Sequence, residues 1–240
     1  MNNSYVIFYI LLICFLSCLL TNNINQTEHF LINSGNPGPT LLLIGGTHGN
    51  EPAGTIGLEK IIDSGISISK GKIIIIPRVN KIGLFFDVRW GFNGFIPIDY
   101  NREYPSTKFE KAGDHINRQI IEYIQISDFI VDFHEGWGFN KIDPDSMGSG
   151  IYPSNFDLPK SIGFDVLNVL NNTINDDEKK FTINYDSPRI PNSLDSYCNA
   201  FNKNYILIET SGQNDIQPLD LRVNQVILVV KTVLKKLEML

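Results

Sequence analysis

Four short, almost wholly apolar runs constrain the fold of this chain more than any other feature of its sequence. They cover residues 41–45, 72–77, 129–133 and 205–208. A strand with one face in water alternates apolar and polar residues, so these runs indicate strands that are buried on both faces. Stretches with a helical pattern follow at residues 51–64, 109–126, 158–172 and 218–237. Strands that alternate with helices predict an α/β fold whose sheet is covered on both faces.

The first 27 residues differ from the rest of the chain. Residues 5–20 are sixteen residues without a charged side chain, and the first charged side chain is that of Glu28. Such a run is short for a membrane span and suits the apolar core of a signal peptide; a retained membrane anchor, with or without a lipid, and a buried core segment are the alternatives. We therefore expect an exported protein that is secreted, periplasmic or membrane-anchored. No repeat or linker divides the remainder, so we expect one domain over residues 28–240.

The composition excludes several classes of protein. Apolar residues make up 42% of the 240 residues and charged residues 19%, which is typical of a globular chain and not of a disordered one. The net charge is -6 and no dense run of Lys and Arg is present, so we predict no nucleic-acid partner. Cys14 and Cys18 lie in the N-terminal run, which leaves Cys198 in the body of the protein. One cysteine can form neither an internal disulfide nor a cysteine-based zinc site.

Polar residues follow the first buried run directly. His48 and Glu51 stand three residues apart where a strand gives way to a helix, which is where ligands bind in open α/β sheets. Neighbouring glycines permit a tight turn there, and Pro52 suits the first turn of the helix. The two side chains can converge on one point. The alternative is a hydrogen-bonded loop histidine and a glutamate favoured by the helix dipole.

The third and fourth apolar runs end in the same way. His134 follows residues 129–133, and Asp132 lies on the same face of that strand, where its carboxylate could hold the imidazole in one tautomer. Two histidines and one carboxylate, with a fourth position left to water, make a catalytic zinc set. Glu209 closes the last run and is a candidate general base and general acid beside such a metal. A structural histidine and a salt-bridged or capping glutamate are the alternatives for His134 and Glu209.

A polar loop between these runs offers a carboxylate-binding pair. Arg102 can bind a carboxylate through two parallel hydrogen bonds, with Asn101 in support. Arg89, upstream in the same connection, could polarise a carbonyl and stabilise an oxyanion. Both arginine assignments depend on the zinc site, because lone loop arginines are usually solvated.

Together these motifs resemble a known family. His48-x-x-Glu51, then Asn101-Arg102, His134 and Glu209, stand in the order found in the zinc carboxypeptidase superfamily, and the segment GGTHGNEPAG at residues 45–54 is similar to its succinylglutamate desuccinylase/aspartoacylase branch. The resemblance spans about residues 40–215. It implies a single domain with a mixed, largely parallel central sheet flanked by helices.

The resemblance also implies roles for these residues. His48, Glu51 and His134 would bind one Zn²⁺ ion per chain, and Glu209 would be the general base. Asn101 and Arg102 would bind a substrate carboxylate, and Arg89 would clamp the oxyanion. Residues 90–98 form an insertion relative to the family pattern. The family's substrate-capping tyrosine has three candidates, which are Tyr152, Tyr185 and Tyr197.

The predicted function is a zinc metallohydrolase that cleaves an amide (C–N) bond next to a free carboxylate. Its substrate would be a small N-acyl amino acid or a peptide with a free C-terminus. The first alternative is a catalytically silent protein of the same fold that binds a carboxylate or a peptide. The second is a membrane-anchored structural protein in which these motifs occur by chance.

Overall fold

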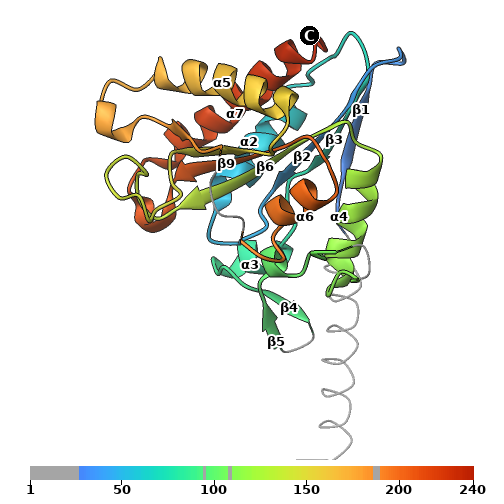
Figure 1. Cartoon of the computed structure of the whole chain (residues 1–240), viewed down its shortest axis with the longest axis horizontal. Coiled ribbons are helices and arrows are strands. Elements are labelled where there is room, and N and C mark those ends of the chain that lie inside the picture. The colour runs from blue at the N-terminus through green and yellow to red at the C-terminus, as the bar shows by residue number, and fades with distance from the viewer. Residues whose placement is uncertain (1–26, 94–95, 108–109, 186–189) are drawn as a thin grey trace, which may run out of the picture.

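The computed structural model describes residues 27–93, 96–107, 110–185 and 190–240 (Figure 1). The predicted leader, residues 1–27, therefore lies almost wholly outside the described residues. The main sheet contains β1 (Phe30–Asn33), β2 (Thr40–Gly45), β3 (Lys72–Ile76), β6 (Phe129–Gly136), β7 (Gly150–Pro153), β8 (Thr182–Ile183) and β9 (Tyr205–Ser211). The described α-helices are α2 (Pro52–Asp63), α3 (Lys81–Phe86), α4 (His115–Gln125), α5 (Asp157–Asn171), α6 (Leu194–Ala200) and α7 (Leu219–Lys236).

The seven strands lie in the order β1-β3-β2-β6-β9-β7-β8. The four strands β3, β2, β6 and β9 are mutually parallel, whereas β1 and β7 run antiparallel to their neighbours β3 and β9. A second, two-stranded sheet pairs β4 (Gly91–Asn93) with β5 (Ile96–Ile98). The prediction of an α/β fold with a mixed, largely parallel sheet is thereby confirmed.

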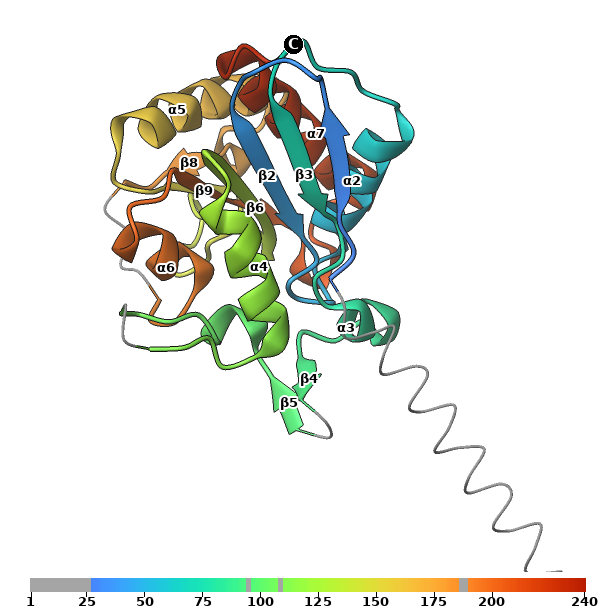
Figure 2. The ribbon, with the colours of Figure 1, turned by 90° about the vertical axis from the view of Figure 1, so that its right-hand side faces the viewer.

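The central strands send alternate side chains into two cores. Leu41 and Leu43 of β2 pack with residues of α2, α5 and α7, whereas Leu42 and Ile44 pack with residues of α4 and α6. Figures 1 and 2 show these two groups of helices on opposite sides of the sheet. Helices on both faces explain why the strands are apolar at consecutive positions, because neither face meets water.

Several boundaries differ from the predicted ones. The strands predicted at 129–133 and 205–208 continue to Gly136 and Ser211, so His134 and Glu209 lie within strands and are paired in register. The backbones of His134 and Glu209 remain paired in the sheet, although the side chains at these positions are polar. The helix predicted from residue 109 begins at His115, because the Asp114 side chain accepts a hydrogen bond from the Ile116 N–H and caps it there.

The segment taken as an insertion, residues 90–98, contains the β4–β5 hairpin. The other strands and α-helices that were not predicted are short or lack a clear hydrophobic periodicity. They are β1, α3, β7, β8 and α6. Among the described helices, none combines the length with the apolar character needed to cross a bilayer.

Candidate active site and metal centre

The candidate site lies at a switch point in the strand order. The chain passes from β2 to β3 on one side and later to β6 on the other, so the carboxyl ends of β2 and β6 flank a crevice. His48 follows β2 and His134 lies near the end of β6, one on each side of that crevice. Glu209 stands beside His134 on the next strand, β9. The order of the strands therefore gathers the predicted site residues at one edge of the sheet.

The loop that carries His48 depends on two glycines. Gly46 has a left-handed backbone with φ 68°, which glycine adopts at no steric cost. A Cβ at Gly49 would lie 1.8 Å from the carbonyl carbon of Gly83, so the loop packs directly against the backbone of α3. These two constraints fix the turn that aims His48 at the crevice.

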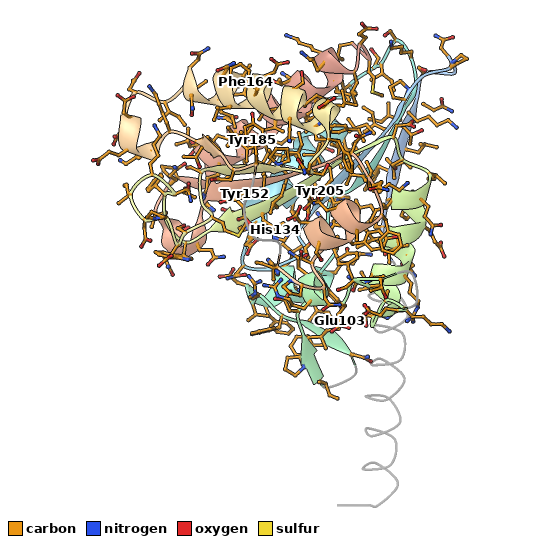
Figure 3. The ribbon with its side chains drawn as sticks, in the orientation of Figure 1. Glu103, His134, Tyr152, Phe164, Tyr185 and Tyr205 are labelled. Carbon is orange, nitrogen blue, oxygen red and sulfur yellow. The ribbon has the colours of Figure 1, made fainter. Side chains whose placement is uncertain are left out.

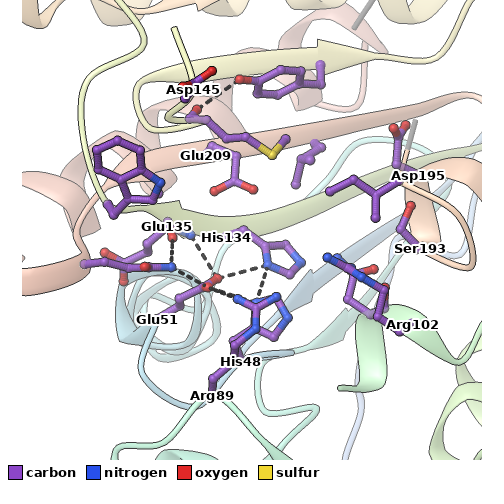
Figure 4. Close-up of a pocket in the computed structure, with 18 residues that line it drawn as sticks. His48, Glu51, Arg89, Arg102, His134, Glu135, Asp145, Ser193, Asp195 and Glu209 are labelled. Atoms are coloured by element: carbon purple, nitrogen blue, oxygen red, sulfur yellow. Dashed lines mark hydrogen bonds and ion pairs between the residues drawn. The ribbon is translucent and has the colours of Figure 1, made fainter. Parts of the chain in front are cut away.

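The side chains of His48, Glu51 and His134 converge. Each offers one ligand atom, and the three atoms lie within 4.8 Å of one another (Figure 4). Nδ1 of His134 lies 3.0 Å from Nδ1 of His48 and 3.0 Å from Oε2 of Glu51, and Nδ1 of His48 lies 2.9 Å from Oε1 of Glu51. All three residues are at most 3% exposed. The structure thus brings together the three residues predicted to bind zinc.

The far nitrogen of each imidazole contacts a carboxylate. Nε2 of His48 lies 3.0 Å from Oδ1 of Asp99, and Nε2 of His134 lies 3.2 Å from Oδ2 of Asp132. A carboxylate at Nε2 favours a proton there and leaves the Nδ1 lone pair free, which is the form that binds a metal. The contact between Asp132 and the His134 imidazole is the one predicted from their positions on the same face of the strand. Asp99 supplies the equivalent contact for His48.

Backbone and side-chain donors fix the Glu51 carboxylate. The N–H of Glu135 donates to Oε2 and the side-chain amide of Gln213 donates to Oε1, each at 3.0 Å. Glu51 occupies the N-cap position of α2 but makes no capping hydrogen bond. The Glu135 carboxylate accepts the hydrogen bond from the Ala53 N–H instead, at 2.7 Å. Glu135 therefore caps the start of α2, and the Glu51 carboxylate contacts the two histidines instead.

The charges of this cluster stabilise one another. Burial alone would raise the pKa of Glu51, but the charge of His48 and hydrogen bonds with both histidines hold it well below its usual range. Burial alone would lower the pKa of His134, but the charge and hydrogen bond of Asp132, together with Glu51, raise it well above its usual range. The cluster is thus arranged for a buried anionic carboxylate that faces positive charge.

The donor set fits a zinc ion. Two imidazole nitrogens and one carboxylate oxygen are zinc ligands, and ligand atoms at about 2.0–2.2 Å from a tetrahedral ion stand roughly 3.4 Å apart. The observed separations of 2.9–3.0 Å require the side chains to move only slightly outward. The structure therefore supplies a candidate metal site of the kind found in zinc enzymes.

Glu209 faces this cluster from β9. It is 7% exposed, and its carboxylate lies across the cavity from Glu51 and His134 (Figure 4). Burial raises the pKa of Glu209 to about 8; the negative charges of Glu51 and Asp132 add to the rise, while His134 opposes it. A carboxyl group with a pKa near neutrality can both accept and donate a proton.

A cavity of about 280 Å³ opens beside Glu209 and the cluster. Arg89 lines it and is fixed by two hydrogen bonds to Asp99, at 2.9 and 3.2 Å, and by a longer contact of 3.4 Å to Glu51. Arg102 lies at another part of the wall, near Ser193 (Figure 4). The two arginines therefore present positive charge at separate points of one small cavity.

Asn101 and Arg102 differ in how firmly they are held. The Asn101 side chain accepts a hydrogen bond from the Leu194 N–H at 2.9 Å, which ties the loop to the start of α6. The Arg102 guanidinium donates to the Asn101 carbonyl at 2.7 Å and is otherwise exposed. Asn101 thus fixes the backbone from which Arg102 reaches the cavity.

The three candidate tyrosines have different surroundings. Tyr152 lines the cavity, and its hydroxyl donates to the Met147 carbonyl at 3.2 Å. The Tyr185 ring lies 5.8 Å from the Lys160 ammonium, and Tyr197 of α6 is buried in the core. Figure 3 shows Tyr152 close to His134 and Tyr185 farther from it. Tyr152 is therefore the candidate that reaches the site.

Four residues that support the site were not predicted from the sequence. Asp99, Glu135 and Gln213 contact the ligand residues as described, and Arg222 of α7 is paired with the Glu135 carboxylate. Asp99 could have been found, because it precedes Asn101-Arg102 in the same motif. The other three carry no local signal, since each meets its partner across more than 75 residues of sequence.

Comparisons with known proteins show which folds this chain is similar to. No curated protein matches the sequence. A point variant of cell shape determinant protein Csd4 from Helicobacter pylori has a similar structure, with a TM-score of 0.73 and 19% identity over 89% of this chain and 55% of Csd4. The mDAP-bound form of Csd4, a D,L-carboxypeptidase, gives a TM-score of 0.70 and 18% identity over 88% of this chain and 55% of that one.

A product-bound structure of the ectoine utilization protein EutE (DoeB) from Ruegeria pomeroyi gives a TM-score of 0.62 and 17% identity, covering 89% of this chain and 61% of that one. The chain spans only 55% of the length of the Csd4 structures. At these identities the likeness concerns the fold. Residues 37–141 match the model of the succinylglutamate desuccinylase/aspartoacylase catalytic domain, the family that the motifs resemble.

Proposed function

We propose that this protein is a zinc-dependent hydrolase that cleaves an amide bond next to a free carboxylate. The observation that carries the proposal is the convergence of His48, Glu51 and His134 within 4.8 Å, at a cavity that also presents Glu209. A zinc ion at these ligands would polarise the scissile carbonyl and acidify the attacking water. The family match and the fold of Csd4 support this assignment.

Three residues of the chain have the other roles in the reaction. Glu209 accepts a proton from the attacking water and donates it to the leaving amine, a double role that a pKa of about 8 permits. Arg89 stabilises the negative charge that develops on the carbonyl oxygen. Arg102 binds the free carboxylate of the substrate through paired hydrogen bonds.

The cavity limits the size of the substrate. Its volume of about 280 Å³ is just below the usual range for small-molecule sites, about 300–1,000 Å³. One terminal residue of a peptide, or one N-acyl amino acid, is the class of substrate that matches this size and the two arginines. Csd4, which shares the fold, binds a tripeptide and mDAP. A peptide with a free C-terminus is thus the first substrate to test.

Metal analysis coupled to product release tests the proposal. We expect the purified full chain to bind one zinc ion and to release amino acids from N-acyl amino acids or from peptides with a free C-terminus. A chelator should abolish release and added zinc should restore it. Stoichiometric zinc without hydrolysis of any panel member would identify a silent binding protein. Absence of zinc binding would refute the assignment altogether.

A further inference from the structure

A group of large apolar side chains is exposed at one end of the molecule. The exposed fractions are 82% for Phe85, 64% for Phe86, 47% for Trp90 and 68% for Ile96. We call these four residues the apolar patch. Phe85 and Phe86 belong to α3 and contact each other edge to face, with ring centroids 4.9 Å apart. Trp90 immediately precedes β4, and Ile96 begins β5.

The apolar patch stands on a rigid base. Asn80, which is 1% exposed, accepts a hydrogen bond from the Gly83 N–H at 2.8 Å and donates one to the Arg89 carbonyl at 3.3 Å. One buried amide thus ties the start of α3 to Arg89, the residue that precedes Trp90. The patch side chains take no part in these contacts, so their exposure is not needed for folding. Figures 1 and 2 show α3 and the hairpin projecting from the body.

The described chain begins beside this same structure. The Glu28 carboxylate lies 3.9 Å from the ammonium of Lys81, the first residue of α3, and Thr27 is held by Gln119 of α4. The uncharged run of residues 5–20 ends seven residues before Thr27. The first described residues, which the apolar run of residues 5–20 precedes in the sequence, therefore lie at the same end of the molecule as the exposed aromatic side chains.

We propose that the apolar patch docks this protein onto a lipid bilayer. Exposed Trp and Phe rings partition into the interfacial region of a bilayer, where their apolar bodies leave water. None of the four patch residues is cationic, and the chain has a net charge of -6, so the attraction is hydrophobic and does not depend on anionic lipid. Arg89, next to Trp90, lines the cavity, so docking holds the active site close to the membrane surface.

The two tryptophans of the chain provide a matched test. Trp90 and Trp137 are almost equally exposed, at 47% and 46%, but Trp137 lies on the wall of the cavity and outside the patch. The Trp137→Phe variant of the full chain reports on Trp90 alone, and the Trp90→Phe variant reports on Trp137 alone. Each variant is mixed with phosphatidylcholine vesicles whose acyl chains are brominated, and fluorescence quenching is measured.

We expect bromine to quench Trp90 at least about threefold more than Trp137, because a docked patch inserts its rings into the bilayer interface. Added salt should leave the quenching unchanged. A chain tethered by its N-terminal segment alone would bind the vesicles but leave Trp90 no more quenched than Trp137. That result would overturn the proposal, as would a failure of the chain to bind vesicles.

A second experiment substitutes two residues of the apolar patch. In the Trp137→Phe background, Phe85→Ser with Phe86→Ser should remove most of the quenching of Trp90. Phe164→Ser is the control, because Phe164 is 52% exposed on α5 at the opposite end of the molecule (Figure 3). Shielding of Trp90 from aqueous iodide before lipid is added would instead show that a second copy or the N-terminal segment covers the patch, and would also overturn the proposal. None of these outcomes depends on hydrolysis.

Discussion

Glu209 is a buried acidic residue that faces the cluster of His48, Glu51 and His134, and its expected chemistry follows from that position. We expect Glu209→Gln to lower kcat by about 10²–10⁴, the usual contribution of a general acid–base group. Zinc content should not change, because the ligand atoms belong to other residues. Kinetics and metal analysis of the same preparation check both points. Loss of zinc from the variant would show that Glu209 is a ligand and not the base.

Burial of Glu209 also makes stability depend on pH. Its folded-state pKa of about 8 lies above the ordinary value of 4.5, so protonated Glu209 favours the folded state below pH 4.5, and this contribution is lost as the pH rises toward 8. Glutamine cannot ionise. In metal-free protein, the Tm of Glu209→Gln relative to wild type should therefore rise between pH 5 and about 8 and then level off. A constant difference in Tm across this range would contradict the raised pKa.

Arg102 is the residue proposed to bind the free carboxylate of the substrate. Because lysine cannot reproduce the paired hydrogen bonds of a guanidinium, Arg102→Lys should raise KM for substrates with a free α-carboxylate and leave kcat nearly unchanged. Amidated substrates should be poor for the wild type and insensitive to the substitution. Steady-state kinetics on a matched pair of free and amidated peptides measures this. Equal activity of the wild type on both peptides would mean that no carboxylate is recognised.

At the scale of elements, a buried ion pair joins helix α7 to strand β6. Arg222 is 2% exposed and is paired with Glu135, which is 1% exposed. Glu135 in turn accepts the hydrogen bond from the Ala53 N–H at the start of α2. Both α2 and α7 therefore contact the strand that carries His134 through the Glu135 carboxylate.

Removing the arginine leaves that carboxylate buried without its cation. We expect Arg222→Leu to reduce the free energy of unfolding by about 3–5 kcal/mol, measured by urea denaturation. Adding Glu135→Gln should recover part of the loss. Arg78→Leu is the control, because Arg78 is 49% exposed in its pair with Glu59 and its loss should cost at most about 1 kcal/mol. If Arg222→Leu and Arg78→Leu reduced the free energy of unfolding by similar amounts, the buried ion pair would contribute no more to stability than the exposed one.

At the scale of the whole molecule, the site joins segments that are distant in sequence. His48 follows β2 and His134 lies on β6, so a metal ion bound by both stabilises the folded sheet and not the unfolded chain. Zinc at about 100 times its Kd should add about 2.7 kcal/mol to the free energy of unfolding. For a chain of this size, this corresponds to a rise in Tm of about 5–10 °C.

Differential scanning calorimetry with and without zinc measures this shift. His48→Gln is the informative variant, because it removes one ligand while retaining a polar side chain of similar size. The zinc-dependent rise in Tm should be largely lost in that variant. An undiminished rise would place the metal elsewhere on the protein.

The sequence by itself determined the positions of the four central strands and of the residues at their ends. Long apolar runs must be buried on both faces, and the carboxyl ends of parallel strands share one edge of the sheet. Those two rules were enough to bring His48, Glu51, His134 and Glu209 together as candidates. The GGTHGNEPAG segment and the order of the motifs added the resemblance to a family whose catalytic-domain model residues 37–141 match.

Only the tertiary structure decided which atoms meet. That Nδ1 of each histidine faces the metal position follows from Asp99 and Asp132 at the other nitrogen, and the position of Glu51 depends on Gln213, 162 residues away. Short elements such as β4 and β5, with three residues each, are too brief for a periodic pattern to show in the sequence. The sequence also cannot tell an exposed phenylalanine from a buried one, since local pattern does not record which neighbours cover a side chain. The apolar patch is visible for that reason in the folded molecule alone.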